Sequence, residues 1–274
     1  MKKKYYITTP IYYPSAKPHI GHAYSSISAD FIARYKRLEG FDVEFVTGTD
    51  EHGQKIQKSA KKKNLSPLDF CNKISKVFLD LGKILNLSNT DFIRTTENRH
   101  YKTVQKLWKI LEEKKFIYLS KYSGWYSISD EAFYSETEII DKENIKLCEA
   151  TGSIVEWVEE ESYFFKLSEF QDILIKHYED NPDFIQPASR RNEVISFVKD
   201  GLKDLSISRN SFKWGIPVPN SKDHIIYVWL DALANYLTAS NYDEENSFWP
   251  ADVHVIGKDI LRFHAVYWPA FLFA

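Results

Sequence analysis

The chain has 274 residues, 43% of them hydrophobic and 27% charged, so it can bury a sizeable core in one large domain with an insert or in two domains. Its formal net charge of −2 excludes a generally basic nucleic-acid coat, and its two distant cysteines, Cys71 and Cys148, disfavour a disulfide framework and favour a reducing, cytosolic compartment. No run approaches the ~18 apolar residues of a membrane helix, so no membrane partner is expected.

The first predicted element is a short strand at 4–8, followed by a loop and the tetrapeptide His19-Ile20-Gly21-His22, which opens a helix expected to start near Ala23. Gly21 lets the backbone approach a ligand, and the free N–H groups of a helix start attract phosphate. Both imidazoles can donate a hydrogen bond to a phosphate. The order predicts a nucleotide triphosphate site, whereas the simpler interpretation is that the histidines only cap a helix.

A second strand is predicted at 42–46, running into the acidic, glycine-bracketed loop 47–53. The helix between the two strands carries an apolar residue at every third or fourth position. We expect this face to dock on the sheet and complete a βαβ unit. The residues of this predicted apolar face are Ala23, Ile27, Phe31, Tyr35 and Leu38.

Helices are then predicted at 66–85 and from 97 or 98 to about 115, followed by strand-like segments at 117–122, 124–128, 154–158 and 163–167. Further helices are expected at 168–179 and from near Arg190. The parallel-sheet pattern is expected to return at 225–228 and at 253–256. These changes predict an α/β nucleotide fold in two halves, 1–116 and 223–274, split by a mostly β connective domain at 117–222.

The chain resembles the bacterial methionyl-tRNA synthetases, which belong to the class I aminoacyl-tRNA synthetases, and the resemblance extends over essentially all residues. It is carried by seven motifs in order: Thr8-Thr9-Pro10-Ile11-Tyr12-Tyr13, His19-Ile20-Gly21-His22, Thr47-Gly48-Thr49-Asp50-Glu51-His52-Gly53, Asp204-Leu205-Ser206-Ile207-Ser208-Arg209, Trp214-Gly215-Ile216-Pro217, Tyr227-Val228-Trp229-Leu230-Asp231-Ala232 and Gly257-Lys258-Asp259-Ile260.

The resemblance implies a Rossmann-like catalytic domain in the cytoplasm that joins methionine to ATP, giving methionyl adenylate and pyrophosphate, with Mg²⁺ travelling with ATP. The methionyl group then passes to the initiator or elongator methionine tRNA. By the same resemblance His19 and His22 are the catalytic residues that stabilise the phosphates. Gly21 makes room for the adenine, and Gly257 and Asp259 hold the ribose side.

For the amino acid, the resemblance implies that Asp50 pairs with the ammonium and that the Tyr236 hydroxyl and the Ile11 N–H donate weakly to the sulfur. Aromatic residues at helical spacing also pack in ordinary cores, which is the alternative for Trp229, Tyr267 and Trp268. The full methionine set is Pro10, Ile11, Tyr13, Asp50, Trp229, Ala232, Leu233, Tyr236, Ile260, His264, Tyr267 and Trp268.

Two departures from the family change the expectations. Many relatives carry a zinc knuckle in the connective domain, but the corresponding positions are Ser127, Asp130, Cys148 and Thr151, so we predict no structural zinc and a knuckle held by packing of Trp125, Phe133 and Tyr134. The lysine-rich mobile loop and the anticodon-binding domain of the family do not occur in these residues. The chain is therefore expected to bind methionine and to be weakly active or inactive by itself.

Alternatives remain at this level. A cysteinyl- or leucyl-tRNA synthetase or a small nucleotidyl transferase shares the histidine tetrapeptide, and a noncatalytic relative would bind RNA or a protein. A cysteinyl-tRNA synthetase would need metal ligands in the pocket, and a leucyl-tRNA synthetase usually carries a large editing insert; the sequence offers neither. The connective domain is expected to handle the acceptor end of the tRNA, with Arg190 and Arg191 as candidates for phosphate contact.

Overall fold

The computed structural model describes residues 2–142 and 145–274, and its central element is a parallel sheet of order β12-β1-β2-β3. The strands are β1 (Lys4–Thr8), β2 (Asp42–Thr49), β3 (Asp91–Arg94) and β12 (Val253–His254). Ile7 of β1 is in register with Phe45 on one side and Val253 on the other. The last strand in sequence thus lies beside the first, so the two ends of the chain build one sheet.

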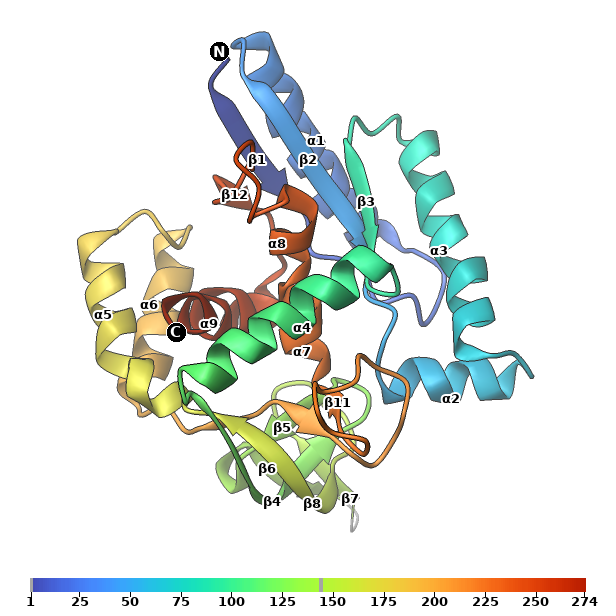
Figure 1. The fold of residues 1–274 in the computed structure, drawn as a ribbon, viewed down its shortest axis with the longest axis vertical. Helices are drawn as coiled ribbons and strands as arrows, with labels where there is room; N and C mark the ends of the chain where they lie inside the picture. The colour runs from blue at the N-terminus through green and yellow to red at the C-terminus, as the bar shows by residue number, and fades with distance from the viewer. Residues whose placement is uncertain (1, 143–144) are drawn as a thin grey trace.

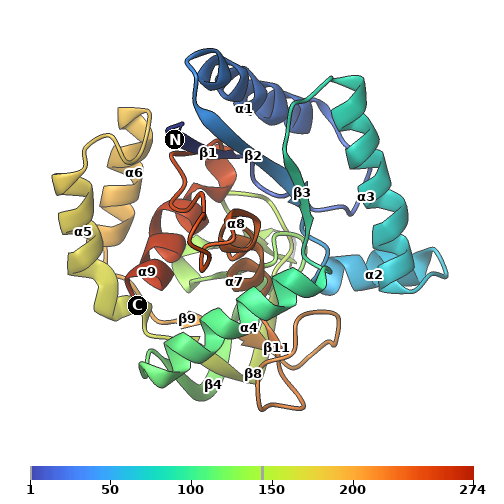
Figure 2. The same cartoon turned by 45° about the horizontal axis from the view of Figure 1, so that its top comes forward.

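Helices cover both faces of this sheet (Figures 1 and 2). On one face, Ile7 and Phe45 pack against α1 (Ile20–Leu38), while on the other Tyr6 and Val46 pack against α8 (Asn235–Ser240). Successive residues of β1 and β2 therefore point to opposite helical layers, as the pleat of a strand requires. The connection from β2 to β3 contains α2 (Gln54–Lys62) and α3 (Pro67–Ile84).

The prediction for α1 was wrong in its start and in its buried face. The helix begins at Ile20, not near Ala23, and its buried residues are Ser26, Ala29, Asp30 and Ala33. The small side chains of Ala29 and Ala33 let the helix lie close to the sheet, and Asp30 accepts hydrogen bonds from the backbone N–H and the hydroxyl of Ser88. The apolar residues of the opposite side are half or more exposed: Ile20, Tyr24, Ile27, Phe31, Tyr35 and Leu38.

Residues 117–222, called the insert below, form an antiparallel sheet of order β5-β4-β8-β9. Its strands are β4 (Ile117–Ser127), β5 (Ala132–Tyr134), β8 (Glu156–Phe165) and β9 (Leu205–Ser206). The two short strands predicted at 117–122 and 124–128 are one strand, β4. A hairpin, β6 (Ile139–Lys142) and β7 (Ile145–Cys148), and two helices, α5 (Gln171–Asp180) and α6 (Ala188–Lys199), complete this part.

The predicted return of the parallel sheet at 225–228 was also wrong. Only Ile225–Ile226 form a strand, β11, which pairs antiparallel with β10 (Ser208–Arg209). Tyr227 then begins α7 (Val228–Leu233). A short apolar run with buried residues on both sides does not reveal which kind of sheet buries it. The prediction at 253–256 was right in pairing, since β12 joins β1 in parallel.

The largest apolar core joins the insert to the second half of the chain. Trp108 of α4 (Asn98–Glu113), Phe165 of β8 and Phe271 of α9 (Trp268–Phe273) are members of this core and are at most 2% exposed. Before α9 the chain forms a 3₁₀ turn at Lys258–Ile260 and a π-helical turn at Phe263–Tyr267. Within the described residues, no helix is both long and apolar enough to cross a bilayer.

Candidate functional site

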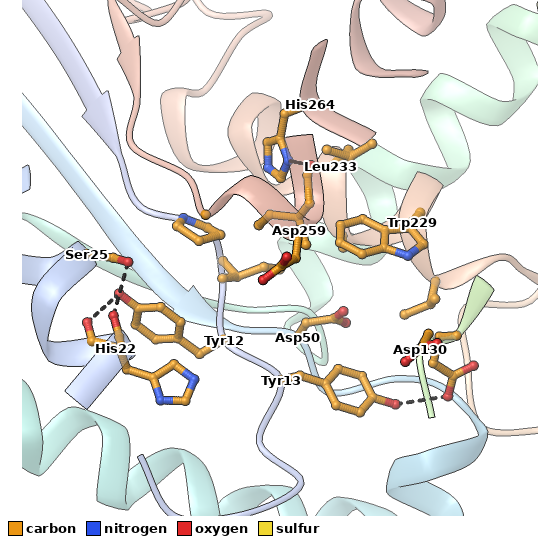
Figure 3. A pocket seen from close by; sticks show the side chains of 18 of the residues that line it. Tyr12, Tyr13, His22, Ser25, Asp50, Asp130, Trp229, Leu233, Asp259 and His264 are labelled. Atoms are coloured by element: carbon orange, nitrogen blue, oxygen red, sulfur yellow. Dashed lines mark hydrogen bonds between the residues drawn. The ribbon is translucent and has the colours of Figure 1, made fainter. Parts of the chain in front are cut away.

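A cavity of about 500 Å³ opens at the carboxyl ends of β1 and β2. Parallel α/β sheets bind ligands at this edge. The start of α1, the helices α7 and α8, and the turn between β4 and β5 complete its wall (Figure 3). Fifteen predicted site residues line it: Pro10, Ile11, Tyr13, His19, Gly21, His22, Asp50, Trp229, Ala232, Leu233, Tyr236, Gly257, Asp259, Ile260 and His264.

The two histidines at the start of α1 have defined proton positions. Nδ1 of His19 accepts from the Gly21 N–H at 3.1 Å, and Nδ1 of His22 accepts from the His19 N–H at 3.0 Å. Burial, with help from His19, lowers the pKa of His22 to about 4, so its ring is neutral near pH 7 and carries its proton on Nε2. A Cβ on Gly21 would lie 3.0 Å from the His19 ring. The pair thus caps α1 and also presents donors to the pocket.

Of the residues that the structure describes, Asp50 is one of two buried acids that line the pocket. It is 8% exposed, and its Oδ1 has no hydrogen-bond partner among the described residues. Burial raises the pKa of Asp50 well above its usual range, and the negative charges of Asp231 and Glu131 raise it further. Figure 3 shows the carboxylate in the pocket, with Tyr13 to one side and Trp229 to the other. No salt bridge joins this side chain to a cation in the part of the chain that the structure describes, and a ligand ammonium would supply one.

Behind Asp50, the fully buried carboxylate of Asp231 accepts two hydrogen bonds, from Nδ1 of His52 at 2.6 Å and from Nε2 of His100 at 2.8 Å. Burial acts to raise the pKa of Asp231, but the two histidines outweigh it and lower the pKa. His52 also lies 3.0 Å from the Tyr101 hydroxyl. This Asp231 cluster joins the loop after β2 to α4 and α7.

The proton of the Tyr236 hydroxyl is directed at His264. Nδ1 of His264 donates to the Ile260 carbonyl at 2.9 Å, and burial lowers the pKa of this histidine to about 4, so the neutral ring leaves Nε2 as an acceptor. The Tyr236 oxygen lies 2.7 Å from Nε2 and therefore donates to it. In this arrangement the hydroxyl does not donate to a ligand sulfur, whereas its ring still forms the pocket wall.

Another wall of the pocket is aromatic and is formed by Trp229. The rings of Trp229 and Phe263 stack with centroids 3.7 Å apart, and Nε1 of Trp229 is buried without a partner among the described residues. Two predicted residues do not line this pocket. Tyr267 lines a neighbouring cavity on the insert side, and Trp268 packs behind Tyr236 with 2% of its surface exposed.

The pocket is open on the side of residues 257–259, which are exposed. A Cβ built on Gly257 meets nothing within 4 Å, so the fold itself does not require a glycine there. The carboxylate of Asp259 lies 2.6 Å from Nζ of Lys258, and both side chains are exposed. Both positions fit contacts with a ligand that enters from this side.

The sequence analysis assigned no role in this pocket to seven residues that line it. Tyr12 and Ser25 neighbour predicted residues in sequence, but the others come from α2, from the start of α7 and from the turn between β4 and β5. The paired acids at that turn, directly after a strand, were the available signal. The seven are Tyr12, Ser25, Lys55, Ser129, Asp130, Glu131 and Val228.

The knuckle positions do not fit a zinc centre. The Asp130 carboxylate accepts from the hydroxyls of Tyr134, Thr151 and Ser153 at 2.9, 2.8 and 2.7 Å. Structural zinc needs about four nitrogen or sulfur ligands, and Cys148 is the only one at these four positions. The hydrogen bonds to Asp130 connect the two loops of the knuckle, while the ring of Trp125 contacts Trp157 and that of Phe133 contacts Tyr126.

The parallel sheet, with a helix capped by histidines and a cavity at the carboxyl ends of its strands, defines an α/β protein of the nucleotide-binding, Rossmann-like class. Residues 5–274 match the family described as tRNA synthetases class I (M). The chain belongs to this family, as its motifs predict.

Named relatives agree with this assignment. The chain is 59% identical to a methionine--tRNA ligase of Rickettsia conorii and 57% identical to one of Rhizobium meliloti, over 100% and 98% of its length and 54% and 53% of theirs. It matches Mycobacterium tuberculosis methionyl-tRNA synthetase in complex with methionyl-adenylate with a TM-score of 0.97 and 52% identity, covering 99% of this chain and 54% of that one. The chain thus spans about half the length of these relatives.

Proposed function

We propose that this chain carries the amino-acid-activating site of a methionyl-tRNA synthetase, which joins L-methionine to ATP. One observation carries the proposal: a single cavity holds the buried carboxylate of Asp50, whose Oδ1 has no partner within the described residues, and the histidines His19 and His22, whose Nδ1 atoms accept backbone N–H groups. The first suits the ammonium of an amino acid and the second suits the phosphates of a nucleotide. The relatives named methionine--tRNA ligase support the choice of substrate.

In the proposed reaction, a carboxylate oxygen of methionine attacks the α-phosphorus of ATP, and the bond from that phosphorus to the bridging oxygen of pyrophosphate breaks. The enzyme needs no nucleophile, so its residues act by positioning and by stabilising charge. Asp50 would bind the ammonium, and Nε2–H of His19 and His22 would donate to the phosphates. Mg²⁺ would enter with ATP as part of the substrate.

The walls of the cavity suit a thioether. Ile11, Leu233 and Ile260 supply aliphatic surface, and Trp229 supplies a flat aromatic surface. An unbranched, polarizable side chain packs well against such a mixture. Gly21, Gly257 and Asp259 are proposed to hold the adenine and ribose.

Transfer to the initiator or elongator methionine tRNA, in the cytoplasm, belongs to the same proposal. We place the first half of the catalytic domain at 1–116, the connective domain at 117–222 and the second half at 223–274. The connective domain would meet the acceptor end of the tRNA. Arg190 and Arg191 stay candidates for phosphate contact, although their guanidinium groups pair with Glu193 and with the carbonyl of Pro182.

The test is calorimetric titration of the chain with methionine, with leucine as the control ligand and Asp50→Ala as the control protein. We expect methionine to bind, leucine to bind at least tenfold more weakly, and Asp50→Ala to abolish measurable binding. A folded chain that does not bind methionine, or that binds leucine equally well, would refute the proposal. Exchange of pyrophosphate into ATP, dependent on methionine, then tests the chemical step.

A further inference from the structure

The turn between β4 and β5 brings a second carboxylate to the pocket from the insert. Glu131 is 5% exposed and has a φ of 50°, a left-handed conformation that a non-glycine residue adopts at a cost of about 1 kcal/mol or more. Its carbonyl accepts from the Tyr227 hydroxyl at 2.6 Å. The hydrogen bonds of the neighbouring Asp130 to Tyr134, Thr151 and Ser153 hold the turn in this shape.

The Glu131 side chain bonds to three separate segments. Oε1 accepts from the Tyr13 hydroxyl at 3.2 Å and from the Lys55 N–H at 3.0 Å, and Oε2 accepts from the Tyr126 hydroxyl. Tyr13 and Lys55 line the pocket, and Lys55 lies in the first turn of α2, directly after the loop that carries Asp50. One carboxylate of the insert therefore holds two walls of the pocket.

The packing around this carboxylate leaves little freedom. Gly53, at the end of the Asp50 loop, has a φ of 105°, and a Cβ there would lie 2.7 Å from the Tyr13 hydroxyl and 2.9 Å from Oε1 of Glu131. A side chain at position 53 would therefore collide with both groups. A shift of Glu131 would move Tyr13 or the loop.

The charge of Glu131 also acts on the proposed ammonium site. Glu131 and Asp231 are the two acids from other parts of the chain whose charges affect Asp50, and Glu51 and His52 adjoin it in sequence. Asp231 accepts hydrogen bonds from two imidazoles, whereas the Glu131 carboxylate accepts from two hydroxyls and a backbone N–H, none of which carries a positive charge. Glu131 therefore adds negative potential to the pocket, which favours a cationic ligand.

We propose that Glu131 is a positioning and specificity residue of the methionine pocket, supplied by the insert: it holds Tyr13 and the Asp50 loop in place and favours ligands with a charged amine. This inference rests on the proposed function, because methionine is the ligand used to test it. Glu131 acts through Asp50 and Tyr13 and needs no contact with the reacting atoms.

The test compares Glu131→Gln with the native chain by calorimetric titration with methionine and with its 2-hydroxy analogue, which keeps the carboxylate and the thioether but lacks the amine. We expect Glu131→Gln to weaken methionine binding about tenfold and binding of the hydroxy analogue less than twofold. Equal weakening of both ligands would show a purely structural role and overturn the specificity claim. Unchanged methionine binding would overturn the whole inference.

The matched control is Glu149→Gln, an exposed glutamate of the same insert, which should bind both ligands like the native chain. Tyr13→Phe removes the hydroxyl donor to Glu131 and should weaken both ligands about equally. If Glu131→Gln does not fold by circular dichroism, Tyr13→Phe still decides the positioning claim, since native affinity in that variant would refute it. A native chain that fails to bind methionine instead refutes the proposed function.

Discussion

The buried carboxylates of Asp50, Glu131 and Asp231 interact electrostatically at the pocket, and their hydrogen-bond partners differ. Asp231 accepts from two histidines, and Glu131 accepts from two hydroxyls and a backbone N–H. Asp50 alone among these three keeps a buried oxygen without a partner within the described residues. Among these three carboxylates, Oδ1 of Asp50 is therefore the acceptor that a ligand cation would pair with.

This difference predicts a pH dependence of methionine binding. Because burial raises the pKa of Asp50, the empty pocket binds a proton that the ammonium must displace. Affinity should then rise as the pH increases through the range in which Asp50 ionises, with release of up to one proton. Titrations in buffers of different ionisation enthalpy measure that proton, and Asp50→Asn should show no such release. Binding without proton release at any pH on the acid side of this range would contradict the prediction.

A second residue-scale prediction concerns His264 and stability in acid. Its ordinary pKa is 6.5, and burial lowers it to about 4 in the folded chain. Between these values the unfolded chain binds more protons, so stability should fall as the pH decreases from about 6.5 to about 4, by up to about 3 kcal/mol from this residue. Urea unfolding of the native chain and of His264→Asn across this range checks it.

His264→Asn should lose part of the slope of stability against pH. The ring of His254 lies beside that of His264, with centroids 6.5 Å apart, and burial lowers the pKa of His254 to about 3. A residual slope is therefore expected from His254. An identical slope in the variant and the native chain would rule out His264 as the source.

Residues that carry a local motif were predictable, and residues brought to the pocket by the insert were not. His19, Gly21 and His22 form their cap within four residues, so the sequence contains the whole arrangement. Glu131 lies 118 positions from Tyr13, and their contact depends on how the insert folds over the first half. Spacing along the chain does not contain that information.

At the scale of elements, α1 shows why an apolar stripe is an ambiguous signal. Both sides of this helix have a regular spacing: one presents large apolar residues and the other presents Ala29 and Ala33. Close approach to the sheet favours the small residues because the backbone of the helix can then pack against Ile7 and Phe45. The prediction weighed hydrophobicity and ignored the distance at which a helix packs.

A pair of substitutions tests this packing. Ala29→Leu should overfill the interface between α1 and the sheet and destabilise the chain by about 2 kcal/mol. Phe31→Ser, on the exposed side of the same helix, should change the free energy of unfolding by less than about 0.5 kcal/mol. Urea denaturation of both variants gives the comparison, and a larger loss in Phe31→Ser would show that the exposed face is the one that matters.

The knuckle gives the next element-scale prediction. Removing the Asp130 acceptor leaves three hydroxyl donors without their partner, so Asp130→Ala should destabilise the insert by about 1 to 2 kcal/mol. Chelator treatment of the native chain should leave the unfolding midpoint unchanged. Stoichiometric zinc in the purified protein, or a chelator-induced loss of stability, would overturn the assignment of this role to hydrogen bonds.

At the scale of the whole molecule, the Asp231 cluster connects three parts of the chain. Replacing its carboxylate by an amide leaves one histidine N–H facing an NH₂ group in a fully buried site. Asp231→Asn should therefore destabilise the chain by about 3 kcal/mol. Asp243→Asn, which breaks an exposed ion pair with Lys106, should cost less than about 1 kcal/mol. Thermal unfolding distinguishes the two, and equal losses would contradict the assigned importance of the cluster.

The Asp231 cluster also determines the order in which parts of the pocket can form during synthesis. His52 and Asp231 lie 179 positions apart, so His52 leaves the ribosome long before its partner exists. At about 5 to 20 residues per second, translation of the intervening chain takes about 10 to 35 s. During that interval the nascent first half contains the His19–His22 helix cap and the loop with Asp50 and His52. It still lacks Asp231, which accepts the hydrogen bond from His52. The histidine-capped start of α1 can therefore form during synthesis, whereas the surroundings of Asp50 are complete only after residue 231 has emerged.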